Sequence, residues 1–376
     1  MSQLHDHAPP SAIDAAEAVA APRVACVVVS FNGAAWIGDC LRALRASTVP
    51  LRMIVVDNAS SDDTCAIVRG FPEVTLIQEP KNLGFGRANN AGIARALADG
   101  ADHVFLLNQD TVLAPDAVEH LEREAARDPS LGILCPLQLD AGGQALDPTF
   151  LRYYVATHAI PYLTDALRGH TIAPHYRAEA LPAAAWLLTR TFLEQVGGFD
   201  PLFFLYCEDD DVCARAKHHG FGIALVPGAT FRHLRGFHVK QAQPLLKHLR
   251  RRGSRLRSQI VFDLKRPEAR ALRHVWYALG GHLFTAAQQL FVYLNWRETL
   301  AELGALAHVL PEIPRIRRHR AVCLTRGPHW IGLSASGRVG GDPDAVVTPS
   351  PHTAPAPGAA NPDAREASFS TQSPKQ

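Results

Sequence analysis

The sequence predicts an α/β protein with a doubly wound, mostly parallel sheet, followed by a helical C-terminal extension. Short β-branched runs without polar breaks, such as 24–30, are typical of strands buried on both faces. Helical patterns of crossover length separate these runs, which favours parallel pairing. Beyond Arg232 the composition becomes basic and helical instead. These three features predict one sheet-based domain with helices added at its C-terminal side.

The predicted elements follow in chain order. After the first strand, Trp36, Ile37, Leu41 and Leu44 recur at helical spacing. Further strands are expected at 53–57, 74–77, 103–107, 131–139 and 223–226. Helices are expected to open at Asp62 and Asp63 and to cover 88–97 and 208–219, while 140–180 is expected to be irregular. Alternating strands and helices thus account for most of 23–234.

Composition bounds the class of protein. The chain has 376 residues, 47% of them hydrophobic, which is enough to bury a large core. A net charge of +2 gives no indication of a nucleic-acid partner, and we expect none. The seven cysteines are odd in number and never form a C-x-x-C pair, so we expect no disulfides and a reducing, cytoplasmic location.

Four regions are predicted. Residues 1–22 lack the features of a secretory signal and are expected to be a disordered arm. The sheet-based domain is expected at 23–234 and a basic helical region at 235–336. The segment 337–376 is rich in Pro, Ala, Ser, Gly and Thr, and it is expected to be a disordered tail.

Polar residues follow four of the predicted strands where each strand ends. They are Asn32, then Asp57 with Asn58, then 82–86, then 108–110. In open α/β sheets, ligands bind outside the carboxyl ends of the strands. The coincidence of four such ends predicts a ligand site at one edge of the sheet.

Each of these motifs has a plainer alternative when it is taken alone. Asp57 suits a nucleoside base or ribose hydroxyl, but it also suits an Asx turn before the next helix. The Gly84-Phe85-Gly86 stretch allows close approach of a diphosphate to a helix N-terminus, although a Gly-x-Gly is usually only a turn. Asp110 suits a hard divalent ion, or a turn cap before Pro115.

Four successive acidic residues occupy 208–211. Such a run usually marks a solvated helix start, where the helix dipole relieves the repulsion. However, Asp209 shares its helix face with Val212, Cys213 and Ala216. A carboxylate at the head of a buried face is a candidate general base. Asp211 is expected to pair with Arg215 on the outer face.

Five ordered blocks of sequence resemble the inverting GT-A glycosyltransferases, in particular the rhamnosyltransferase-like branch that builds bacterial surface polysaccharides. The blocks are VVVSFNG at 27–33, VVDNASSDD at 55–63, NLGFGRANN at 82–90, LLNQDT at 106–111 and the stretch from GGFDP to TFRH at 197–233. The resemblance implies a GT-A type sheet and a metal-dependent transfer from a nucleotide-sugar donor.

The resemblance also implies roles for individual residues. The expected nucleotide-sugar-binding residues are Asn32, Asp57, Asn58, Gly84, Phe85, Asn90 and Asn108. Asp110 matches the last position of a metal-binding Asp-x-Asp element whose first position is Asn108 here, and His233 would complete a Mg²⁺ or Mn²⁺ site. Asp209 matches the catalytic base. Cys207 stands where relatives commonly have Gly, and we interpret it as a small buried residue and not a nucleophile.

The implied reaction moves L-rhamnose from dTDP-rhamnose to a hydroxyl of a glycan or lipid-linked glycan. A UDP-hexose or UDP-galactofuranose donor is the alternative within the same reaction class. A nucleotidyltransferase would need a Gly-rich, basic phosphate loop after the first strand, and 30–33 is not one. A non-catalytic nucleotide-sugar-binding module would have no use for Asp110, Asp209 and His233 together.

The basic region leaves two interpretations open. Between Arg232 and Arg273 the only acidic residues are Asp263 and Glu268, and 274–296 has no Asp, Glu, Lys or Arg but many aromatics. This pattern favours an interfacial helix on an anionic membrane, which would make the protein peripheral on the inner face of the plasma membrane. It equally suits a helical hairpin packed on the catalytic domain. Polar residues and two glycines make 274–296 a poor spanning helix.

Overall fold

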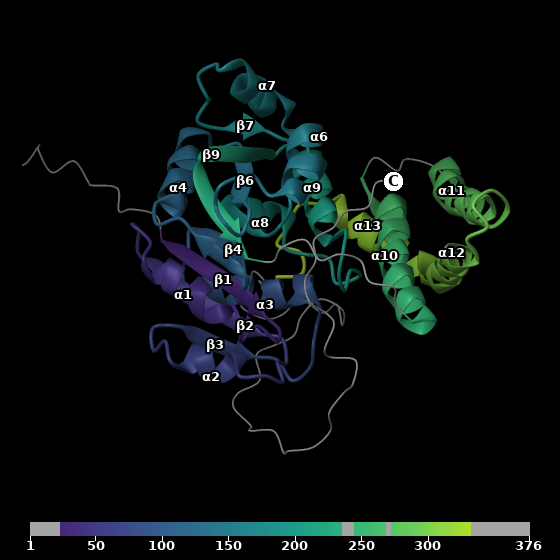
Figure 1. The fold of residues 1–376 in the computed structure, drawn as a ribbon, viewed down its shortest axis with the longest axis horizontal. Helices are drawn as coiled ribbons and strands as arrows, with labels where there is room; N and C mark the ends of the chain where they lie inside the picture. Colours follow the sequence, from purple (N-terminus) through teal and green to yellow (C-terminus); the bar gives the residue numbers. More distant parts are fainter. Residues whose placement is uncertain (1–22, 235–243, 268–271, 332–376) are drawn as a thin grey trace, which may run out of the picture.

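The computed structural model describes residues 23–234, 244–267 and 272–331 (Figure 1). The arm predicted at 1–22 and the tail predicted at 337–376 lie outside these residues. The seven cysteines all lie within them, and all seven are free thiols, as the sequence predicts.

One mixed sheet contains the described strands. Its order is β3 (Thr75–Gln78), β2 (Leu51–Asp57), β1 (Val24–Ser30), β4 (His103–Asn108), β8 (Ala185–Thr189), β6 (Leu131–Leu139), β9 (Gly222–His233) and β5 (Thr111–Leu113), and β7 (Tyr176–Arg177) pairs with β9. The first four strands in this order are parallel, and β6 is parallel to β9. Strand β8 runs antiparallel between β4 and β6. The predicted α/β class is confirmed, and the sheet is mixed because β5 and β7 also run antiparallel to β9.

Helices cover both faces of this sheet. One face packs against α1 (Ile37–Arg45), α2 (Thr64–Arg69) and α4 (Ala117–Arg127). The other packs against α3 (Phe85–Ala98), α8 (Arg190–Val196) and α9 (Glu208–His218). Strand β1 is apolar throughout because its alternate side chains enter the two cores, Val27 on one side and Val28 on the other.

The prediction that 140–180 is irregular is wrong. Helical turns run through α5 (Pro148–Phe150), η1 (Leu151–Val155), α6 (Ala156–His158) and α7 (Ile160–Arg168). The Asp147 carboxylate caps the first turn, accepting from the N–H of Thr149 at 2.8 Å and of Phe150 at 2.9 Å. A proline at the first helical position after an acidic N-cap is a helix-start signal, and the sequence reading overlooked it.

The C-terminal extension is helical, as predicted. It comprises α10 (Leu245–Lys265), α11 (Leu272–Phe291), α12 (Trp296–Val309), η2 (Leu310–Glu312) and α13 (Ile313–Cys323). A third core joins α10, α12 and α13 to Leu202, Phe203 and Cys207, just before α9. Figure 1 shows α11 and α12 beyond α10, at the end of the molecule away from the sheet. None of the helices in the described ranges combines the length and apolar character that crossing a bilayer requires.

Candidate active site

The loops after β1 and β2 are joined through Asp57. This carboxylate is buried and accepts from the Ser30 hydroxyl at 2.9 Å and the Ser60 hydroxyl at 2.6 Å. It also accepts from the Ser60 N–H, three residues further on, at 3.0 Å. Asp57 therefore fixes the shape of the strand ends, whatever it contributes to a ligand.

Asn32 braces the same two loops from the other side. Its backbone is left-handed, with φ 46°, a conformation that Asn tolerates better than most residues. Its N–H donates to the Ser60 hydroxyl at 2.9 Å, and its side-chain oxygen accepts from the Ser61 N–H at 2.9 Å. The strand ends at β1 and β2 thus form one rigid unit.

Asn58 organises the glycine loop that follows β3. Its buried side chain accepts from the Leu83 N–H at 2.7 Å and donates to the Asn82 side chain at 2.9 Å. Gly84 has φ +85°, and a Cβ there would lie 2.3 Å from the carbonyl oxygen of Phe204. Only glycine satisfies both conditions, which explains the Gly-x-Gly better than a generic turn does.

Asn90 and Phe85 hold the segment that leads towards α9. The Asn90 amide donates to the Phe199 carbonyl and accepts from the Phe199 N–H, each at 2.8 Å. The Phe85 ring meets the Phe199 ring edge-on at 5.7 Å. The hydrogen bonds of the Asn58 and Asn90 side chains go to the protein itself, so their contact with a nucleotide stays a prediction.

Asp110 and His233 come together from distant parts of the chain. Strand β5 pairs with β9 so that Thr111 lies opposite His233, and the Leu234 N–H donates to the Asp110 carbonyl at 2.8 Å. This pairing brings His233 Nε2 to 3.4 Å from an Asp110 carboxylate oxygen. Both side chains are buried. The sequence predicted this pair only through the resemblance, because the residues are far apart in the chain.

The Asp110–His233 pair suits a divalent cation. A carboxylate is a usual ligand of Mg²⁺ and Mn²⁺ in proteins, and an imidazole binds a transition metal such as Mn²⁺ more readily than Mg²⁺. Buried His233 Nε2 makes no hydrogen bond within the described ranges, although its aromatic nitrogen needs a partner when it is buried. Two protein ligands leave the remaining coordination positions to water and to a donor diphosphate.

Gln109 is a site residue to which the sequence reading gave no role. Its side-chain amide accepts from the Phe31 N–H at 3.0 Å and donates to the Phe31 carbonyl at 3.1 Å. A Cβ on Gly33 would lie 1.9 Å from the Gln109 side-chain oxygen. Gln109 therefore ties the loop after β1 to the end of β4, and the Gly33 next to Asn32 was its sequence signal.

Asp209 lies in the first turn of α9, partly exposed, above buried Val212, Cys213 and Ala216. This is the face predicted from spacing. Burial raises the pKa of Asp209, although hydrogen bonds from the backbone of Asp210 and Ala183 oppose that rise. Burial and the neighbouring Asp209 charge raise the pKa of Glu208 well above its usual range.

A short backbone segment connects Asp209 to the end of β4. Ala183 hydrogen-bonds the Asp209 carboxylate, and the next carbonyl, of Ala184, accepts from the Asn108 N–H at 2.9 Å. Asn108 is itself buried, and its carbonyl accepts from the Thr111 hydroxyl at 2.7 Å. The candidate base and the 108–110 motif therefore belong to one hydrogen-bonded neighbourhood.

The prediction that Asp211 pairs with Arg215 on the outer face is wrong. The two side chains do pair, at 2.9 Å, but both are fully buried. Asp211 also contacts Lys265, and Lys265 Nζ lies 2.8 Å from a carboxylate oxygen of Asp200. That face of α9 is covered by the C-terminal helices, which the local sequence pattern does not reveal.

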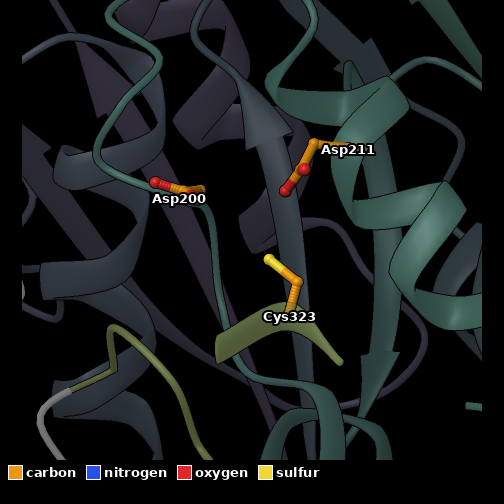
Figure 2. Close-up of side chains that lie close together, drawn as sticks. All are labelled: Asp200, Asp211 and Cys323. Atoms are coloured by element: carbon orange, nitrogen blue, oxygen red, sulfur yellow. The ribbon is translucent and has the colours of Figure 1, made fainter. Parts of the chain in front are cut away.

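Asp200, Asp211 and Cys323 lie close together (Figure 2), with potential ligand atoms within 4.8 Å of one another. The Lys265 ammonium already bridges the two carboxylates. Burial raises the pKa of the Cys323 thiol to about 11, so it stays protonated and is a poor metal ligand. This cluster is a structural ion-pair network.

The chain is similar to a known family and to characterised relatives. The family profile described as glycosyltransferase like family 2 matches residues 22–254. The N-acetylglucosaminyl-diphospho-decaprenol L-rhamnosyltransferase of Mycobacterium tuberculosis is 31% identical over 230 residues, covering 55% of this chain and 74% of that protein. The O-antigen chain rhamnosyltransferase WbaN of Salmonella anatum is 24% identical over 226 residues, covering 58% and 69% respectively.

A solved structure shares the fold. The structure of GalNAc-T7 with UDP, GalNAc and Mn²⁺ superimposes with a TM-score of 0.51 at 12% identity, covering 79% of this chain and 58% of that one. At this identity the likeness concerns the arrangement of sheet and helices alone.

Proposed function

The chain belongs to glycosyltransferase-like family 2 and is a glycosyltransferase, and we propose that it transfers L-rhamnose from dTDP-rhamnose with inversion at the anomeric carbon. The observation that carries the chemistry is the position of Asp209. Its carboxylate accepts a hydrogen bond from the Ala183 backbone, and the carbonyl of the next residue, Ala184, accepts from the Asn108 N–H at the end of β4. The rhamnosyltransferase names of the relatives support the donor.

Asp209 is the proposed general base. It removes the proton from the acceptor hydroxyl while that oxygen attacks the anomeric carbon from the face opposite the diphosphate. The bond to the diphosphate breaks, and the anomeric configuration inverts without a covalent enzyme intermediate. A carboxylate with a raised pKa suits this role, because a base transfers protons best when its pKa lies near the working pH.

The proposed donor pocket is built from the braced strand ends. Asn32 and Asp57 would hold the nucleoside, Gly84 and Phe85 would line its pocket, and Asn108 would contact the nucleotide sugar. Asn58 and Asn90 would act by holding that loop and the 199 segment. Asp110 and His233 would hold Mg²⁺ or Mn²⁺, which when bound neutralises charge on the leaving diphosphate.

The acceptor is the proposal's remaining part. The mycobacterial relative is named for action on a decaprenol-linked sugar. We infer a glycan or lipid-linked glycan hydroxyl as acceptor here, with the enzyme peripheral on the inner, cytoplasmic face of the plasma membrane.

A donor panel tests the proposal. Purified full-length chain is incubated with dTDP-rhamnose, UDP-hexoses or UDP-galactofuranose, Mg²⁺ or Mn²⁺, and a polyprenyl-diphosphate-linked acceptor, and the product linkage is determined by NMR. We expect transfer from dTDP-rhamnose with an inverted anomeric centre. Transfer from a UDP-sugar alone would replace the donor, and a retained configuration would refute the role of Asp209.

A further inference from the structure

Helix α11 carries its apolar stripe on the outside of the protein. Trp276 is 72% exposed and Phe291 is 76% exposed, and Leu283, Phe284 and Leu290 are exposed between them. These positions fall at i, i+7, i+8, i+14 and i+15, so they share one helix face. Large apolar side chains normally face a core, and here they face away from it.

The opposite face of α11 binds α12. His282 Nδ1 lies 2.9 Å from a carboxylate oxygen of Glu302, and Ala286 is buried against α12 with its carbonyl accepting from Thr299. The orientation of the exposed stripe is therefore set by contacts on the other side of the helix. The exposed stripe thus belongs to a helix that is held against the protein on its other face.

The turn between the two helices continues this apolar surface. Val292, Tyr293 and Leu294 are exposed, with Leu294 at 79%, and Trp296 and Leu300 extend the surface along α12. From 274 to 296 the chain contains no Asp, Glu, Lys or Arg. A contiguous exposed surface of this kind marks an interaction site. We call residues 276–300 the hairpin surface.

A basic rim borders the hairpin surface. Glu298 at the start of α12 pairs with Arg252 at 2.6 Å and with His248 at 3.2 Å, which brings the start of α10 next to the turn. Arg251 is exposed next to Arg252 in that part of α10, and exposed Arg297 stands beside Trp296. The acidic side chain nearest the turn is thus already bound to basic partners.

We propose that the hairpin surface docks on an anionic lipid bilayer, with its aromatic side chains among the headgroups and its arginine rim against the lipid phosphates. Trp and Tyr favour the membrane–water interface, and basic residues beside them bind anionic lipid. The hairpin surface lacks charged side chains from 274 to 296 and is bordered by arginines, so it matches a bilayer better than a second copy of this chain, whose identical rim would repel it.

Helix α10 connects this surface to the active site. Ser258 donates to the Leu205 carbonyl at 3.0 Å, and the Arg255 guanidinium lies over the Tyr206 ring at 5.2 Å, just before α9. Helix α10 therefore links the hairpin surface to the segment that precedes α9. This docking rests on the proposed function only for its purpose, because a lipid-linked acceptor would lie at the surface of the bilayer.

Vesicle sedimentation tests the docking. Full-length protein is spun with phosphatidylcholine vesicles with or without phosphatidylglycerol, at low and at high salt. The exposed-residue variant Phe284→Ser/Phe291→Ser/Leu294→Ser should lose most binding to both vesicles. Arg251→Gln/Arg297→Gln should lose about twenty-five-fold in affinity for anionic vesicles, since each basic residue near the surface contributes about five-fold. Leu167→Ser, an exposed apolar residue on α7, is the matched control and should bind as the parent does.

The outcomes separate docking from function. Equal sedimentation of the parent and the triple variant would overturn the docking, as would an absence of vesicle binding at low salt. If the parent instead self-associates in ultracentrifugation through this surface without binding vesicles, the surface is an interface between copies and the proposal is overturned. Transfer to a soluble acceptor glycoside should be unchanged in the triple variant, and transfer to a vesicle-embedded acceptor should fall. Vesicle binding without any sugar transfer would refute the proposed function and leave the docking standing.

Discussion

Asp209 and Asp211 stand two residues apart on α9, yet their surroundings differ in every respect that governs reactivity. Residues at this spacing point to nearly opposite sides of a helix. Asp209 faces the end of β4, is partly exposed, and makes no ion pair with any residue of the described ranges. Asp211 is fully buried between Arg215 and Lys265.

The protein's own cations account for the difference. Burial alone would raise the pKa of Asp200, but Lys265 and His319 outweigh it and hold that pKa below its usual range. The carboxylates of Asp200 and Asp211 in turn raise the pKa of Lys265 against the effect of burial. A carboxylate matched by internal cations has little affinity left for a substrate proton. A carboxylate raised by burial, as Asp209 is, retains that affinity.

Among the changes that affect the site around Asp209, metal removal should reduce sugar transfer the most. Asp110 and His233 offer few ligands, so the donor diphosphate should supply others and exhaustive chelation should reduce transfer to background. Calorimetry should show Mn²⁺ binding much more tightly with nucleotide than without, and His233→Ala should abolish that gain. His308→Ala, an exposed histidine on α12, is the control. Full activity after chelation would refute the metal role.

Lys265→Met should be the most damaging change on the Asp211 side. It leaves two buried carboxylates without their shared partner, and breaking a buried ion pair from one side typically costs about 3–5 kcal/mol of unfolding free energy. Urea unfolding followed by circular dichroism measures it. Lys217→Met is the matched control, because Lys217 pairs with Glu179 at 2.7 Å on the surface. Exposed pairs typically contribute about 0–1 kcal/mol. Equal losses for the two variants would contradict the assignment of the buried cluster as structural.

The pH dependence of turnover should reflect Asp209. A base works only when deprotonated, and a raised pKa keeps the proton on to higher pH. Turnover should therefore fall on acidification at a pH above the ordinary range for aspartate. The limb belongs to Glu208 and Asp209 as an interacting pair. A kcat profile at saturating donor measures it, with folding followed in parallel. An acid limb at the ordinary aspartate value would place the base in a different environment.

The smallest expected change is Cys207→Gly. Cys207 has φ 63°, a left-handed conformation that costs a non-glycine residue about 1–2 kcal/mol. Glycine relieves that strain but loses a buried thiol and adds entropy to the unfolded chain. The unfolding free energy should change by no more than about 1 kcal/mol, and activity should persist. Burial raises the pKa of this thiol well above its usual range, so loss of activity would be the unexpected result.

Local patterns in the sequence predicted the features that depend on local physics. The unbroken apolar runs predicted β1, β2 and β4, because a strand covered on both faces needs such a run. The helical spacing of Val212, Cys213 and Ala216 predicted the buried face of α9. The spacing of the seven cysteines likewise predicted that they are free thiols.

The errors arose where distant segments decide the outcome. The spacing of Asp211 and Arg215 predicted their pairing but not their burial, because the helix that covers them carries Lys265, 54 residues further along the chain. The bonds of the Asn90 amide to Phe199 cross 109 residues, so the local sequence pattern did not reveal them either. The helices at 148–168 are different, since the Asp147-Pro148 start signal was local and was overlooked.

The most direct test of the central claim, that Asp209 is the base, is donor binding and turnover of Asp209→Asn. The change removes the charge and keeps the shape, so the protein should remain folded and bind donor as the parent does. Its kcat should fall on the order of 10²–10⁴-fold, the usual contribution of a general base. Asp210→Asn, one residue further along the same helix turn, is the comparison that should leave more activity. Near-normal kcat in Asp209→Asn would contradict the account and move the search for the base to Glu208.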